Sequence, residues 1–312
     1  MELNAKIFVA GHNGMVGSAI IRKLKSLGYT NIVTADKSRY NLLNQNHVQS
    51  FFSNELPEYV FLAAARVGGI KANNELKGDF IYENLMIQSN VIKCSHYFGV
   101  KKLLFLGSSC IYPKLSTQPI KEEYLLSGYL EPTNDAYAIA KIAGIKMCQS
   151  FNEQYGTNFI SVMPTNLYGP NDNYDLNNSH VLPAMIRKFH EAKIQNKTNV
   201  EIWGTGTPMR EFLYVDDLAY ACIYLMNKYN SSEIVNIGTG KDITIKELSF
   251  IVKEVVGFEG GIFFNDKMPD GTPRKLLDVA KLKELGWQYK TELEYGISLT
   301  YSDFLKNNNY NE

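Results

Sequence analysis

Short apolar runs alternate with longer stretches of mixed polarity along the first half of the chain. The apolar runs occupy residues 6–10, 32–35, 59–65 and 102–107. The stretches of helical length between them include residues 18–27, 47–54 and 80–98. A strand that is apolar along its whole length is typical of a parallel sheet covered by helices on both faces. The pattern therefore predicts an α/β fold of the Rossmann type, with a doubly wound parallel sheet.

The second half of the chain has a different texture. Residues 159–164 continue the apolar runs, but residues 171–178 form a polar loop, which is typical of a segment that lines or covers a site. Apolar runs at residues 211–215 and 234–238 then indicate a return to the sheet. We therefore expect a smaller domain interleaved with the first. The predicted boundaries are 1–165 for the sheet domain, with a return around 211–240, and 166–210 with 241–312 for the smaller domain.

Three glycines, Gly11, Gly14 and Gly17, follow the first predicted strand and open the first predicted helix. In this context glycines allow a tight turn, a close approach of backbone to a pyrophosphate, and packing of helix on strand. The N-terminus of the helix then faces the phosphates. The sequence therefore predicts a dinucleotide site in the first domain. The other residues of the turn that we expect at this site are Asn13, Met15 and Val16.

The residues after the second predicted strand bear on the choice of coenzyme. Asp36 lies about 20 residues beyond the glycines, where a carboxylate binds the free ribose hydroxyls of NAD and repels the 2′-phosphate of NADP. Lys37 and Arg39 have the opposite effect if they turn toward a phosphate, although two solvated surface cations are an equally good interpretation. These residues alone leave both NAD(H) and NADP(H) open.

Tyr137 and Lys141 are four residues apart in a stretch of helical composition, so both project from one helix face. A neighbouring ammonium favours the phenolate form of a tyrosine, which makes proton exchange feasible near neutral pH. Ser108 follows an apolar strand, and a hydroxyl at the carboxyl end of a parallel strand points into the ligand crevice. The three residues together predict a reductase.

Composition narrows the classes of partner. The chain has 32 basic and 32 acidic side chains, and this neutrality argues against a nucleic acid or a membrane surface. No apolar run approaches the length of a membrane span, and we expect a cytoplasmic protein. The four cysteines contain no C-x-x-C pair and the five histidines do not cluster, so we expect reduced thiols and no metal.

Several longer motifs carry a resemblance to a known family. The chain resembles the extended short-chain dehydrogenase/reductases and, within them, it is similar to the GDP-L-fucose synthase family from end to end. The segments that carry the resemblance are residues 11–17, 63–69, 107–114, 164–170, 178–181, 204–212 and 269–275. The first motif is common to the superfamily, whereas the segments around Cys110 and His180 are more specific.

The resemblance implies conversion of GDP-4-keto-6-deoxy-D-mannose to GDP-L-fucose by epimerisation at C3 and C5 and reduction at C4. Inversion beside a ketone needs a base on one ring face and an acid on the other. The family pattern assigns these roles to Cys110 and His180, and it assigns protonation of O4 to Tyr137 with Ser108 as a hydrogen-bond partner. A packed thiol and a loop histidine are the structural alternatives for the first two residues.

The matching segments also imply binding residues. For the coenzyme they add Ala64, Pro164, Asn166, Leu167 and His180 to the residues named above, and Lys141 holds the nicotinamide ribose. For the GDP-linked sugar they imply Ser109, Cys110, Arg187, Lys188, Trp203, Arg210 and Lys275. The family implies NADP(H), which we favour, although Asn13 and Asp36 depart from the arginines common in the family and keep NAD(H) as an alternative.

Two alternatives to this function and one expectation about assembly remain. A related GDP-4-keto-6-deoxy sugar such as a heptose would need only a different pocket around residues 171–178, with or without epimerase activity. A coenzyme-binding regulator without turnover is a different class, but it has no need of Ser108, Tyr137 and Lys141. The resemblance also implies a homodimer through the helix of Tyr137. The apolar side chains Ile139, Ile142, Ile145 and Met147 serve either that interface or the packing under the sheet.

Overall fold

The computed structural model describes residues 1–176, 178–268 and 270–307. The polar loop at residues 171–178 and the motif at residues 269–275 therefore each include one position outside the described residues. The last five residues of the predicted smaller domain, 308–312, lie outside them as well.

Six parallel strands form the central sheet and confirm the predicted α/β fold. They are β1 (Ile7–Ala10), β2 (Ile32–Val33), β3 (Tyr59–Leu62), β4 (Lys102–Leu106), β5 (Phe159–Pro164) and β9 (Val235–Ile237). Their order is β2-β1-β3-β4-β5-β9. The order reverses between β1 and β3, and doubly wound sheets bind ligands outside the carboxyl ends of the strands at such a point.

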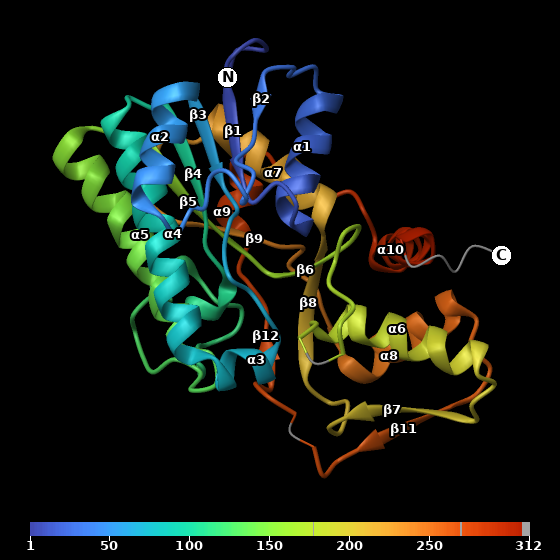
Figure 1. The fold of residues 1–312 in the computed structure, drawn as a ribbon. Helices are drawn as coiled ribbons and strands as arrows, with labels where there is room; N and C mark the ends of the chain where they lie inside the picture. Colours follow the sequence, from blue (N-terminus) through green and yellow to red (C-terminus); the bar gives the residue numbers. More distant parts are fainter. Residues whose placement is uncertain (177, 269, 308–312) are drawn as a thin grey trace.

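Helices cover both faces of this sheet (Figure 1). One face carries α1 (Met15–Ser26) and α7 (Val215–Lys228), and the other carries α2 (Gln45–Glu55), α4 (Lys77–Tyr97) and α5 (Asp135–Tyr155). Each face has its own apolar core. Ile142 and Ile145 of α5 are buried in the second core, Met147 packs against it, and Ile139 is 48% exposed.

A second group of elements lies beside the carboxyl edge of the sheet, at the lower right of Figure 1, with a third apolar core. Its strands are β6 (Asn166–Tyr168), β7 (Asn199–Trp203), β8 (Met209–Tyr214), β10 (Asp242–Thr244), β11 (Gly261–Asn265) and β12 (Arg274–Lys275). Its helices are α6 (Val181–Ile194), α8 (Ile245–Val256) and α10 (Leu293–Asn307).

The expected return of residues 211–215 to the central sheet is wrong. β8 pairs with β6, β10 and β12 in a separate sheet, whereas β9 pairs with β5 and rejoins the central one. Phe212 and Tyr214 of β8 pack in the third core, whereas Leu213 packs in the first, and an apolar run gives no information about which sheet its strand joins.

Four short helices complete the fold of the described residues. The short helices are α3 (Ile70–Glu75), α9 (Ala280–Glu284), η1 (Ser109–Ile111) and η2 (Glu122–Tyr124). None of the helices described is both long enough and apolar enough to cross a bilayer. Within the same residues, no three His, Cys, Asp or Glu side chains lie close enough together to hold a metal ion.

Candidate active site

The glycine turn after β1 forms a cradle that other residues would fill. Gly11 has φ of +87°, and a Cβ there would lie 2.7 Å from the backbone nitrogen of Ala64. A Cβ on Gly17 would lie 2.1 Å from the carbonyl oxygen of Gly11. Gly14 is the N-cap of α1, and Met15 and Val16 begin the helix. The glycine turn thus leads directly into the start of a helix, and the free backbone N–H groups of a helix start are a general site for anions.

The loop after β2 holds Asp36 in a local turn. The backbone N–H and the hydroxyl of Ser38 both donate to the Asp36 carboxylate at 2.9 Å, and these bonds lower the pKa of that carboxyl. Lys37 and Arg39 are exposed on the same loop. Ser38 therefore occupies one oxygen of the Asp36 carboxylate. The cations of Lys37 and Arg39 are open to a ligand.

Ser108, Tyr137 and Lys141 meet at the carboxyl end of β4. The Lys141 ammonium donates to the carbonyl oxygen of Leu106 at 2.8 Å and lies 5.8 Å from the centre of the Tyr137 ring. The Ser108 hydroxyl is a hydrogen-bond partner of Tyr137. Burial raises the pKa of Tyr137, and burial lowers the pKa of Lys141 to about 7. Tyr137 is therefore a protonated acid at neutral pH, beside a lysine that exchanges protons there.

Cys110 lies in η1 within reach of the same hydroxyls. Its backbone N–H donates to the Ser108 oxygen at 3.2 Å, and its thiol sulfur is 3.6 Å from the Lys275 ammonium. Burial by itself raises the pKa of the Cys110 thiol. The Lys275 charge and the hydrogen bonds from Ser108 and Asn134 lower it by more, so the net shift is downward. The geometry therefore favours a thiolate beside Tyr137.

His180 is the N-cap of α6 and is placed by contact with the loop after β3. The backbone N–H of Gly69 donates to the Asn178 carbonyl at 2.9 Å, and a Cβ on Gly69 would lie 2.7 Å from the Ser179 carbonyl. Desolvation by the surrounding protein lowers the pKa of the His180 imidazole, and repulsion by the Lys275 charge lowers it further. His180 is nevertheless exposed at the surface.

The coenzyme residues predicted from the remaining motifs lie around the same edge. Ala64 follows β3 and contacts the glycine turn. Pro164 ends β5, and Asn166 and Leu167 lie in β6, where the Asn166 amide donates to the Glu211 carbonyl at 2.8 Å. Ser109, which the resemblance implies for the GDP-linked sugar, is buried in η1.

The cations predicted to bind the substrate lie at different distances from Cys110 and have different partners. Arg210 lies on β8 within electrostatic reach of Cys110 and Asp270. Lys188 lies over the Trp203 ring at 5.5 Å, farther along α6. The Arg187 guanidinium is instead bonded to Glu191 at 2.7 Å and to the Tyr174 carbonyl at 3.0 Å, so it holds α6 to the polar loop.

Sequence reasoning missed three residues that shape this site. Asn134 hydrogen-bonds the Cys110 thiol. Gly69 allows the approach of the His180 loop. Glu211 is fully buried and accepts from the backbone N–H groups of Gly240 and Leu277, which fixes the segment after Lys275. The acidic Glu211 lies within an apolar strand, and this position in the sequence indicates a buried carboxylate that needs hydrogen-bond partners.

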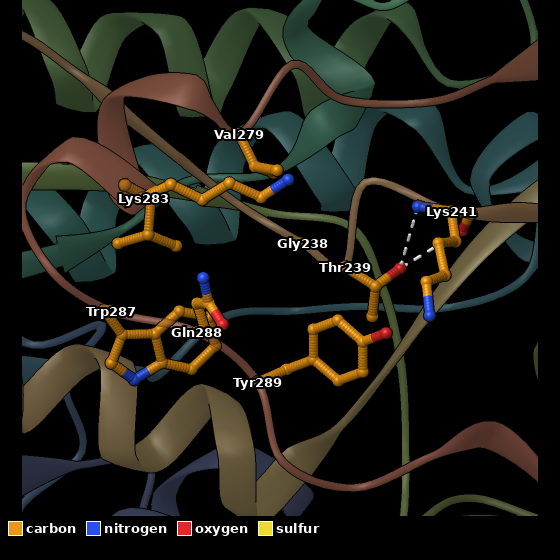
Figure 2. A pocket seen from close by; sticks show the side chains of 9 residues that line it. Gly238, Thr239, Lys241, Val279, Lys283, Trp287, Gln288 and Tyr289 are labelled. Carbon is orange, nitrogen blue, oxygen red and sulfur yellow. Dashed lines mark hydrogen bonds between the residues drawn. The ribbon is translucent and has the colours of Figure 1, made fainter.

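A separate pocket of about 230 Å³ lies beyond the carboxyl end of β9 (Figure 2). It is lined by Gly238, Thr239, Lys241, Val279, Leu282, Lys283, Trp287, Gln288 and Tyr289. This volume is below the roughly 300–1,000 Å³ of ordinary ligand pockets. The lining includes none of the residues predicted from the motifs, and we do not assign the reaction to it.

Comparisons with known proteins bear on the reaction. The model of the NAD dependent epimerase/dehydratase family matches residues 7–238. GDP-L-fucose synthase 1 of Arabidopsis thaliana is 60% identical over 306 residues, which cover 98% of this chain and 95% of the plant protein. Among solved structures, a GDP-6-OMe-4-keto-L-xylo-heptose reductase from Campylobacter jejuni matches with a TM-score of 0.94 at 42% identity, over 98% of this chain and 99% of that chain. A GDP-L-fucose synthetase from Naegleria fowleri bound to NADP matches with a TM-score of 0.92 at 30% identity, over 99% and 96%.

Proposed function

This chain belongs to the NAD dependent epimerase/dehydratase family, and we propose that it converts GDP-4-keto-6-deoxy-D-mannose to GDP-L-fucose. The observation that carries the proposal is the contact of the Cys110 region with Ser108 and Tyr137 at one edge of the sheet. A reductase needs only the serine, tyrosine and lysine, whereas a thiolate beside them supplies a base for epimerisation. The 60% identity to the plant synthase supports the same reaction.

Epimerisation at C3 and C5 is assigned to Cys110 and His180. The C4 ketone acidifies the hydrogens on both neighbouring carbons, so a thiolate at Cys110 takes one proton at a time from one ring face. The electron pair is held as an enolate on O4. His180, at the start of α6, returns a proton to the opposite face, which inverts the carbon. Before the second inversion the Cys110 thiol releases its proton to solvent and His180 takes one up from solvent.

Reduction at C4 is assigned to Tyr137, Ser108 and Lys141. The glycine cradle from Gly11 to Gly17 fits a dinucleotide, and bound NADPH supplies the hydride to C4. Tyr137, held protonated by its burial, donates its proton to O4 as charge develops there. Ser108 hydrogen-bonds the same oxygen, and Lys141 restores the proton of Tyr137.

NADP(H) is the coenzyme that we propose. The Naegleria fowleri neighbour is a structure with NADP bound. In this chain Ser38 engages the Asp36 carboxylate, while Lys37 and Arg39 are exposed on the same loop. In this arrangement Ser38 holds the Asp36 carboxylate in a local turn, and Lys37 and Arg39 are the two cations that we propose to bind the 2′-phosphate.

A heptose substrate is the second candidate, because one specific comparison favours it. The Campylobacter jejuni reductase acts on a GDP-linked 4-keto heptose and matches this fold with a TM-score of 0.94. Its identity of 42% is lower than the 60% to the plant synthase, so the hexose remains our proposal.

We also propose a homodimer located in the cytoplasm. α4 and α5 pack together on one face of the sheet (Figure 1). Each carries an exposed large apolar residue, Tyr82 at 61% and Ile139 at 48%. The four cysteines are unpaired, which is typical of a reducing compartment.

The test is a comparison of kcat/KM for the GDP-linked 4-keto-6-deoxy hexose and for the matching heptose, with NADPH as reductant. We expect the hexose to be preferred and the product to have the L-galacto configuration. Cys110→Ser provides the control, because it should still reduce an already epimerised ketone while failing to epimerise. A preference for the heptose would overturn the substrate assignment.

A further inference from the structure

Lys275 and Cys110 are 165 residues apart in the chain, yet the Lys275 ammonium lies 3.6 Å from the Cys110 sulfur. Lys275 reaches this place from β12, where it pairs with Arg210 of β8. The backbone beyond it is fixed from two sides. Leu276 N–H donates to the Gln118 side chain at 2.8 Å, and Leu277 N–H donates to the buried Glu211 carboxylate at 3.0 Å. The position of the ammonium therefore follows from the fold of both sheets.

The charges around the thiol favour its ionised form. The charged or titratable side chains within electrostatic reach of Cys110 include Lys275 from β12, Arg210 from β8 and Tyr137 from α5. Ser108 and Asn134 add hydrogen bonds. The three remaining cysteines provide an internal comparison, because burial raises the pKa of each thiol. These are Cys94, Cys148 and Cys222.

We propose that Lys275 holds Cys110 as a thiolate before any substrate binds, and that this activating contact is its main role in the reaction. The inference rests on the proposed function in one respect, the use of Cys110 as the base. It goes beyond the expectation that Lys275 binds the GDP-linked sugar. A lysine that served only to bind the substrate would not need to lie 3.6 Å from the Cys110 sulfur.

The contact also links the base to the acid. When Cys110 takes the proton, the C–H bond breaks, the S–H bond forms and the electron pair stays on the sugar enolate. The Lys275 charge is then no longer neutralised by the thiolate. Its repulsion of a protonated His180 increases, which favours release of the His180 proton to the opposite ring face.

The test measures the rate of Cys110 alkylation by iodoacetamide against pH in the full chain, with peptide mass spectrometry to assign the labelled residue. The thiolate is the reactive form, and a neighbouring ammonium favours it by lowering the pKa of the thiol. Lys275→Met should therefore slow alkylation at pH 7 by about tenfold or more and move the midpoint to higher pH. Lys241→Met, which removes an exposed lysine elsewhere, is the matched control and should change neither.

Two results would overturn the inference. One is an alkylation profile that is unchanged in Lys275→Met, or in Lys275→Gln if the methionine variant does not fold. The other is a midpoint in the unmodified protein at or above the ordinary thiol value of about 8.5. Neither measurement uses substrate, so a failure of the proposed function would appear separately, as absence of turnover with the thiolate intact.

Discussion

Arg210 is the residue that we expect to contribute most to binding of the GDP-linked substrate. It lies on β8 beside the proposed catalytic cysteine, and a guanidinium binds phosphate oxygens through paired hydrogen bonds. Arg210→Ala should raise the substrate KM by about tenfold or more, since such a bond contributes about 1.5–3 kcal/mol. Steady-state kinetics of NADPH oxidation measure this.

Arg274 offers a matched control for Arg210. It lies on the neighbouring strand β12, but its guanidinium is bonded to Asp242 at 2.5 Å and is partly exposed. Arg274→Ala should leave the substrate KM within about twofold of the original, because the Arg274 guanidinium is already held by both oxygens of the Asp242 carboxylate. An unchanged KM in Arg210→Ala would remove that residue from the proposed binding site.

Individual residues of the site were predictable to different degrees. The four-residue spacing of Tyr137 and Lys141 fixed their common helix face, and the structure places Lys141 5.8 Å from the Tyr137 ring centre. Nothing local marks Asn134 as a partner of Cys110. The contact of Lys275 with the thiol depends on how β12 pairs with β8, and sequence spacing cannot give pairing between strands so far apart.

At the level of elements, the two glycines that open α1 should respond differently to the same change. A Cβ on Gly17 would lie 2.1 Å from the Gly11 carbonyl, whereas a Cβ on Gly14 would meet the same oxygen at an ordinary 3.5 Å. Gly17→Ala should destabilise the fold by about 1–3 kcal/mol and weaken NADPH binding strongly. Gly14→Ala should keep the melting temperature while still weakening NADPH binding, since its backbone approaches the pyrophosphate.

Thermal unfolding and fluorescence titration with NADPH separate the two effects. If Gly17→Ala kept both its melting temperature and its coenzyme affinity, the packing of α1 on the glycine turn would not have the role we give it.

Lys102 joins the central sheet to the end of α7. Its ammonium donates to the carbonyl oxygens of Leu225 and Met226, at 3.2 and 2.8 Å, and also to that of Tyr229. Lys102→Met leaves these buried acceptors without their donor, so we expect a loss of about 2 kcal/mol or more in the free energy of unfolding. Urea unfolding measures this loss.

The effect of Lys102 should depend on pH. Burial lowers the pKa of Lys102 to about 8, whereas an unfolded lysine titrates near ~10.4. Between these values the unfolded chain binds more protons than the folded chain, so the stability of the original protein rises with pH. The difference from Lys102→Met should therefore grow by about 1 kcal/mol from pH 8 to pH 9. A constant or shrinking difference would contradict the burial of a titrating ammonium.

At the scale of the whole molecule, the apolar runs predicted the central sheet because strands buried on both faces are apolar along their length. The same argument failed for β8, which is also apolar but belongs to the second sheet. Sheet membership depends on the pairing partners β6, β10 and β12, and the period of side chains along one strand does not reveal its partners.

Assembly can be tested at one exposed residue. Ile139 is 48% exposed on α5, at the face where we propose that two copies meet. Ile139→Glu should convert the dimer to a monomer in light scattering after size exclusion, because a buried unpaired charge costs several kcal/mol. Ile194→Glu, which changes an isoleucine 52% exposed at the end of α6, should leave the dimer intact. A dimer that survives Ile139→Glu would place the interface elsewhere.

The central claim is that one site epimerises and then reduces the same sugar. The most direct measurement is mass spectrometry and proton NMR of the product formed from GDP-4-keto-6-deoxy-D-mannose and NADPH in deuterated water. We expect the L-galacto configuration with deuterium at both C3 and C5. A reduced product without deuterium at these carbons would contradict the account, because it would leave Cys110 and His180 without the roles proposed for them.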